Sequence, residues 1–146
     1  MSEMRWGVVE ALLDFVLVQE PCTRDEWSVL EGLLDRLAVA VPRGADVPEC
    51  AAQLPAHDQD AWREMVAQRF PDFGLYAKAS SPDADAGPSG DAIDDLLDIA
   101  LELDRASWCR RHGSPHDGER YLSWAFSTHW GAHLRGLQGY LHHLLY

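Results

Sequence analysis

The chain has 146 residues and carries 24 acidic against 12 basic side chains, a formal charge of -12 at pH 7. This charge repels phosphate backbones and anionic membrane surfaces, so it argues against nucleic acid and membranes as partners. The length suits one domain that buries about two-thirds of the surface that its unfolded chain exposes.

The first predicted helix covers residues 5–20 and is apolar around most of its circumference. A helix of this kind is typical of the centre of a bundle. Glu10 and Asp14 break its apolar stretch before it reaches a membrane-spanning length, and no basic start or cleavage site precedes it. We therefore expect a cytoplasmic protein without an export signal.

Two further helices follow after short connections. Thr23 and Glu26 match a capping box, in which a hydroxyl and a carboxylate satisfy free backbone amides, and this predicts a second helix over residues 24–41. A third helix is expected over residues 58–70, where the acidic first turn suits the helix dipole. The segment 77–90 is rich in Ala, Ser, Asp, Pro and Gly, which is typical of a mobile linker inside one domain.

The fourth predicted helix covers residues 91–112 and begins at Asp91, whose carboxylate can accept from the first free amide groups. It has one apolar and one acidic face. The carboxylates of the acidic face are Asp94, Asp95, Asp98 and Glu102. They are expected to face water and to offer an interaction surface to a basic partner. Asp104 instead falls within the apolar arc, so we expect it to be at least half buried and paired with a basic or hydrogen-bonding group. That group would come from the helix next to Arg105 or from the C-terminal histidines.

The fifth predicted helix, over residues 117–144, is the longest. Its apolar residues form a continuous stripe at i, i+3 and i, i+4 spacing, and this stripe places Trp130 in the core. His129 and His133 lie one turn apart along the edge of the stripe. The opposite side carries small residues that would let another helix, or a second copy of the chain, approach closely. These residues are Ala125, Ala132, Gly136 and Gly139.

These patterns predict an all-α fold, a single-domain bundle of five helices over residues 1–146 without a sheet. The three cysteines are widely separated and form no C-x-x-C pair. The sequence therefore indicates neither a disulfide framework nor a zinc knuckle, and a reducing cytoplasm fits.

Three motifs in the second half of the chain resemble a known family. They are F-P-D-F-G-L-Y at 70–76, D-D-L-L-D-I at 94–99 and W-x-F-x-x-H-W-G at 124–131. Over roughly residues 62–146 the chain is similar to a bacterial family of small proteins catalogued as a domain of unknown function. The resemblance implies a helical fold with an acidic, aromatic turn before its last two helices. It implies no activity or cofactor, and the family's pattern does not fix the position of His133.

Two classes of function stay open. In the first, His129 and His133 share a metal ion with Asp94 and Asp98, because a neighbouring helix can supply oxygen ligands to two imidazoles one turn apart. Against this class, the carboxylates of the fourth helix project away from its apolar face. If both helices bury their apolar faces in one core, the carboxylates and the histidines should not converge.

The second class is an interaction protein, such as an adaptor, an inhibitor or immunity protein, or a chaperone. Its acidic helical surface suits a basic partner, since complementary charge speeds association. No nucleophile elbow and no Gly-rich phosphate loop is present in the sequence. The sequence therefore favours an interaction protein with no catalytic site and no cofactor, and a homodimer through the small-residue side of the last helix is a further expectation.

Overall fold

The computed structural model describes residues 2–44, 50, 53–77 and 89–146. The α-helices in chain order are α1 (Ser2–Val16), α2 (Trp27–Ala40), α3 (Gln59–Arg69), α4 (Ala92–His112), α5 (Pro115–Ala125) and α6 (Gly131–Leu145). A 3₁₀ turn, η1 (Arg24–Glu26), precedes α2, and a π-helical turn, η3 (Phe126–Trp130), joins α5 to α6. The prediction of an all-α helical bundle is confirmed.

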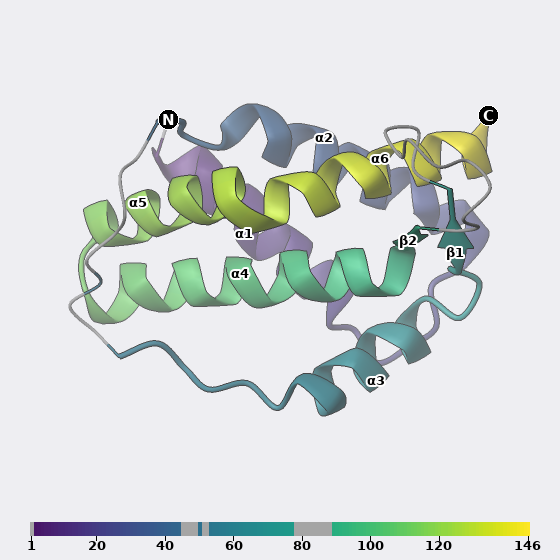
Figure 1. The fold of residues 1–146 in the computed structure, drawn as a ribbon, viewed down its shortest axis with the longest axis horizontal. Coiled ribbons are helices and arrows are strands. Elements are labelled where there is room, and N and C mark those ends of the chain that lie inside the picture. The colour runs from purple at the N-terminus through teal and green to yellow at the C-terminus, as the bar shows by residue number, and fades with distance from the viewer. Residues whose placement is uncertain (1, 45–49, 51–52, 78–88) are drawn as a thin grey trace.

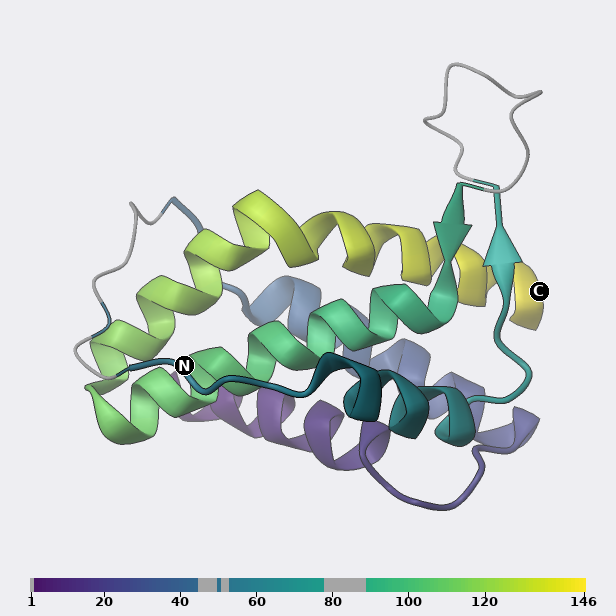
Figure 2. The same cartoon turned by 60° about the horizontal axis from the view of Figure 1, so that its bottom comes forward.

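The helices form two layers with α4 at the centre of the contacts. In Figure 1, α5, η3 and α6 follow one another along the length of α4 and run in the opposite direction. Behind them, α1 packs against α4 and α2 packs against α6. Figure 2 shows α3 lying along the outer side of α4. Neighbouring helices therefore cover α4 on most of its circumference.

The predicted apolar faces meet in one core. Trp130 is 0% exposed, as its place in the stripe predicts, and its indole N–H donates to the Leu122 carbonyl oxygen at 3.3 Å. Trp6 and Trp27 are buried as well. Asp91 caps α4 as predicted, because its carboxylate accepts from the amide groups of the first turn. Within the described residues, no helix combines the length and the apolar character needed to cross a membrane.

The last predicted helix is not continuous. At η3 the backbone makes a π turn, in which the Gly131 N–H donates to the Phe126 carbonyl oxygen five residues earlier. A Cβ atom at position 131 would collide with that oxygen, so the turn requires glycine there. Apolar spacing alone does not detect such a turn, since one wide turn shifts the pattern by a single residue.

The prediction of a fold without any sheet is wrong in one detail. Two short strands, β1 (Leu75–Tyr76) and β2 (Gly90–Asp91), pair antiparallel, with Tyr76 opposite Gly90. Strands of two residues carry no alternation that a sequence pattern could reveal. Most of the predicted mobile linker, residues 78–88, lies outside the described residues.

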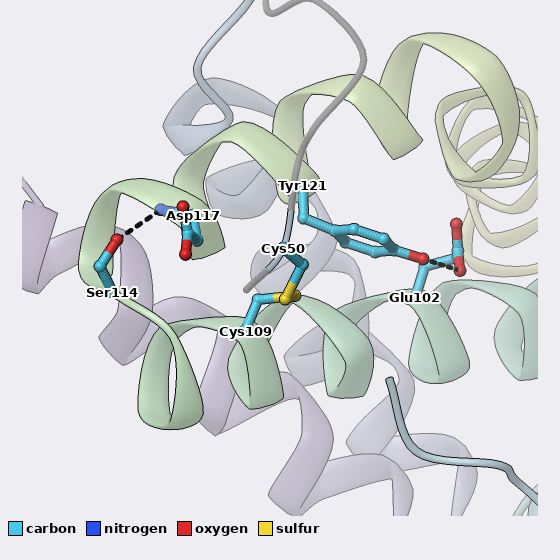
Figure 3. The surroundings of a disulfide bond; sticks show 6 residues. All are labelled: Cys50, Glu102, Cys109, Ser114, Asp117 and Tyr121. Atoms are coloured by element: carbon cyan, nitrogen blue, oxygen red, sulfur yellow. Dashed lines mark hydrogen bonds between the residues drawn. A yellow bond between two sulfur atoms is a disulfide. The ribbon is translucent and has the colours of Figure 1, made fainter. Parts of the chain in front are cut away.

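The cysteine prediction is also wrong. Cys50 and Cys109 form a disulfide that ties the segment before α3 to α4, with their Cα atoms 6.0 Å apart (Figure 3). The two residues are 59 positions apart, so no short spacing motif marks them. Cys22 is buried and free.

Asp104 has the predicted burial but a different partner. Its side chain is 28% exposed, and its Oδ2 lies 2.7 Å from Nε2 of His57. The expectation of burial with a paired group is therefore confirmed, and of the expected partners the C-terminal histidines are wrong. At this position α4 faces the segment that leads into α3, because α6 lies on another side of the helix.

Candidate metal centre

The acidic residues of α4 do not form one solvated face. Asp95 and Glu102 are only 2% and 5% exposed, so the expectation that they face water is wrong. Asp94 is directed elsewhere, because its Oδ1 accepts from Nη1 of Arg63 in α3 at 2.8 Å. The Asp98 side chain is 24% exposed, which lies between the buried Asp95 and Glu102 and the 47% of Asp94. The reason is that α4 is covered on several sides, so some of its acidic positions must lie beneath another helix.

The histidines of η3 and α6 meet the carboxylates of α4. Oδ2 of Asp98 lies 3.0 Å from Nε2 of His133 and 3.7 Å from Nε2 of His129. One ligand atom from each of these three residues lies within 4.8 Å of the others. The expectation that the two groups do not converge is therefore wrong, since the acidic face of α4, and not only its apolar face, packs against the last helical segment.

The first of two arms behind this centre consists of Tyr76, Asp95 and His133, and we call it the inner arm. Nδ1 of His133 lies 2.7 Å from Oδ1 of Asp95, and the Tyr76 hydroxyl donates to Oδ2 of the same carboxylate. The Tyr76 hydroxyl reaches Asp95 by lying against Gly136, where a Cβ atom would collide with it. The β1–β2 pair therefore serves to hold Tyr76 over the buried Asp95.

The second arm consists of Tyr121, Glu102 and His129, and we call it the outer arm. Nδ1 of His129 lies 3.5 Å from Oε2 of Glu102, beyond good hydrogen-bond geometry. Oε1 of Glu102 accepts from the Tyr121 hydroxyl at 3.0 Å, drawn in Figure 3, and from Nη1 of Arg105 at 2.6 Å. The His129 side chain is 44% exposed, compared with 19% for His133.

The inner arm favours the protonated form of His133. The hydrogen bond to Asp95 raises the pKa of His133 above its ordinary value, although burial opposes this rise. Burial raises the pKa of Asp98, and the nearby histidines oppose that change. Burial also raises the pKa of Tyr76 and of Tyr121, so both hydroxyls stay protonated and donate to their carboxylates at neutral pH.

The two arms orient both imidazoles in the same sense. A histidine that donates its Nδ1 proton to a carboxylate presents Nε2 to a metal ion, which displaces any proton held there, and metal-binding histidines have this arrangement. Here both Nδ1 atoms face buried carboxylates and both Nε2 atoms face Asp98. Ligand atoms around a tetrahedral ion lie about 3.3–3.5 Å apart. The exposed His129 would have to move inward to bring its Nε2 within this distance of the other two ligand atoms.

Sequence reasoning named the three central residues and missed their supports. Asp98, His129 and His133 come together, whereas Asp94 does not join them. The roles of Tyr76 and Tyr121 carried no signal in the sequence. The spacing of Asp95 and Glu102 did indicate a role, because these residues lie three and four positions from Asp98 and therefore on its side of the helix. That spacing becomes informative once the acidic face is placed against the histidines.

Comparisons of this chain with protein-family models, curated proteins and solved structures found no match. The family resemblance therefore stays a prediction. The three motifs that carry it meet in space. F-P-D-F-G-L-Y supplies Tyr76, D-D-L-L-D-I supplies Asp95 and Asp98, and W-x-F-x-x-H-W-G forms the π turn with His129.

Proposed function

We propose that the protein binds a divalent transition-metal ion through Nε2 of His129, Nε2 of His133 and a carboxylate oxygen of Asp98. The observation that carries this proposal is the paired orientation of the imidazoles. Each presents Nε2 to Asp98 and has a buried carboxylate at Nδ1. In metal proteins such outer carboxylates fix the ring and raise the basicity of the ligand nitrogen.

A purely structural ion pair explains less of this geometry. His133 alone, between Asp95 and Asp98, would make a satisfied buried pair. His129 adds little to such a pair, because its ring nitrogens lie 3.5 and 3.7 Å from the nearest carboxylate oxygens. The two rings have centroids 5.1 Å apart, and a cation shared between them would give His129 a coordinate bond that the ion pair does not supply.

The donor set narrows the class of metal. Two imidazoles and one carboxylate, without a thiolate, suit zinc, iron(II), manganese or cobalt better than copper(I) or an iron–sulfur cluster. Three protein ligands leave at least one position for water or a small substrate, which is the arrangement of catalytic rather than structural zinc sites. The π turn that contains His129 adds support, since such turns are frequent at functional sites.

Metal analysis of untagged protein tests this proposal. After incubation with zinc and removal of unbound ion, we expect one zinc per chain by mass spectrometry of the dissolved metal. The double variant His129→Ala with His133→Ala should lose it. A matched control, His116→Ala with His142→Ala, removes two exposed histidines outside the centre and should keep it. Zinc below half-stoichiometry, or equal loss in both double variants, contradicts the proposal.

The interaction-protein class is supported by different features and stays a prediction. The net charge of -12 suits a basic protein partner, but Asp95 and Glu102 are buried and cannot contact one. Ala125 is also buried, so the small-residue side available to a second copy reduces to Ala132, Gly136 and Gly139. Identification of proteins that co-purify from the native cell tests this class. The cytoplasmic location is likewise a prediction, and the disulfide removes the cysteine argument for it.

A further inference from the structure

A groove of about 980 Å³ lies between α6 and the β1 strand, on the side of α6 that carries the small residues. This volume is at the upper end of the range for small-molecule sites. Gly136 and Gly139 line it, and a Cβ atom at Gly139 would meet no heavy atom within 4 Å. The missing side chain at Gly139 therefore leaves a hollow on this side of α6, whereas the Tyr76 hydroxyl occupies the space beside Gly136.

The walls of the groove are apolar and aromatic. Leu75 of β1 is 66% exposed, which is unusual for a large aliphatic side chain on a short strand. Tyr140 and Leu144 line the groove from α6, and the ring of Tyr76 lines it from β1. A ligand with an apolar body would cover this surface and remove it from water.

Among the lining residues that the structure describes, the fixed charge of the groove comes from Arg135. Arg135 and His143 line it, and among the lining residues that the structure describes there is no carboxylate. This absence is informative because acidic side chains outnumber basic ones two to one in the chain. The Arg135 guanidinium donates to Oε1 of Gln138 at 3.1 Å, and it has further N–H donors available for a ligand.

We propose that this groove binds an organic acid with an aromatic or aliphatic body, whose anionic head pairs with Arg135. Guanidinium binds carboxylates and similar anions with two parallel hydrogen bonds. A second copy of the chain fits less well, because each copy carries a charge of -12 and the surface is concave. The groove shares the ring of Tyr76 with the inner arm but includes none of the three proposed metal ligands, so this inference does not require a bound metal.

Fluorescence titration with 1-anilinonaphthalene-8-sulfonate, an aromatic anion that brightens in apolar sites, tests the inference on the full chain in EDTA. We expect saturable binding of one molecule, with a dissociation constant on the order of tens of micromolar for a ligand of this size. The uncharged analogue N-phenyl-1-naphthylamine should bind about tenfold more weakly. Near-ultraviolet circular dichroism confirms that each variant is folded.

Two variants separate the anion contact from the apolar contact. Arg135→Gln should weaken the anionic probe about tenfold and leave the neutral analogue unchanged. Gly139→Leu should fill the groove and abolish binding of both probes. Its matched control is Gly7→Leu in α1, an exposed helix position where a Cβ atom also has open space, and this variant should bind like the original chain.

Three results would overturn the inference. The first is unchanged binding of the anionic probe in Gly139→Leu. The second is equal affinity for the charged and the neutral probe. The third is a concentration-dependent dimer, seen by size exclusion with light scattering, that Gly139→Leu dissociates, because the groove would then be an interface between copies. Failure of the zinc experiment leaves all three results unaffected, so the two proposals fail separately.

Discussion

The inner and outer arms of the candidate metal centre have the same order of groups but differ in how tightly they are held. In the inner arm, Asp95 is 2% exposed and lies 2.7 Å from its histidine. In the outer arm, the carboxylate of Glu102 lies 3.5 Å from His129, and the His129 side chain is 44% exposed. The inner arm is thus preorganised, whereas the outer arm has room to adjust.

The difference follows from what else each carboxylate must do. Asp95 accepts from Tyr76 and His133, so its charge is directed at the histidine. Glu102 also pairs with Arg105 at 2.6 Å, which offsets its charge locally. We expect His133 to be the first ligand to hold a metal ion and His129 to close on it afterwards.

Removing the buried Trp130 side chain, which lies in the π turn that joins α5 to α6, should have the largest effect on stability. Trp130 is buried beside His129 in the π turn, so Trp130→Ala should lower the free energy of unfolding by about 3–5 kcal/mol. Zinc binding should fall in both arms together. Denaturant unfolding with and without zinc measures this, and Trp124→Ala, at a partly buried position, is the control with a smaller expected loss. A loss below about 1 kcal/mol contradicts the role of Trp130 in the core.

Zinc affinity should fall by different amounts when the carboxylate of each arm is neutralised. Asp95→Asn keeps the shape of the side chain but removes its charge, so zinc affinity should fall about 10–100-fold, as for other residues that support metal ligands. Glu102→Gln should reduce zinc affinity by less than about tenfold, because its contact with His129 is long. Isothermal titration calorimetry at one pH compares the two variants. Equal losses would show that the arms are equivalent and that the difference in distance has no consequence.

Substituting the two tyrosines should have the smallest effect, and the inner arm should again lose more than the outer arm. Tyr76→Phe leaves the buried Asp95 without one of its two donors, and we expect the metal-free protein to lose about 1–2 kcal/mol. Tyr121→Phe should cost less than about 1 kcal/mol, because Glu102 keeps Arg105. Urea unfolding in EDTA measures both losses. A larger loss for Tyr121→Phe would reverse our assignment of the tighter arm.

The helices could be predicted because their signals are local. Apolar spacing located the core side of the last helix, including Trp130, and the carboxylate of Asp91 marked the start of α4. The inclusion of Asp104 in the apolar arc correctly indicated its burial. The identity of its partner could not follow, because His57 comes from a segment without periodicity and its position depends on the packing of α3.

The candidate metal centre could not be predicted, because periodicity does not say which sides of a helix are covered by other helices. The apolar spacing separated the apolar and acidic faces of α4 correctly. The prediction failed because it took only the apolar face to be covered. With α1, α3, α5 and α6 all packed on α4, Asp95 and Glu102 are covered too. Their burial is tolerated because each has hydrogen-bond donors from another element, and Tyr76 and Tyr121 supply these donors.

The Cys50–Cys109 disulfide has a consequence for the unfolded chain. A covalent loop across 59 positions removes conformational freedom from the denatured ensemble, which corresponds to about 4 kcal/mol of stability by loop-closure entropy. A thiol reductant would remove that contribution without breaking any contact of the metal centre. The chain thus has one free energy of unfolding when oxidised and a smaller one when reduced. Variants can be ranked only within a single redox state, because the difference between the two states is as large as the greatest mutational effect expected above.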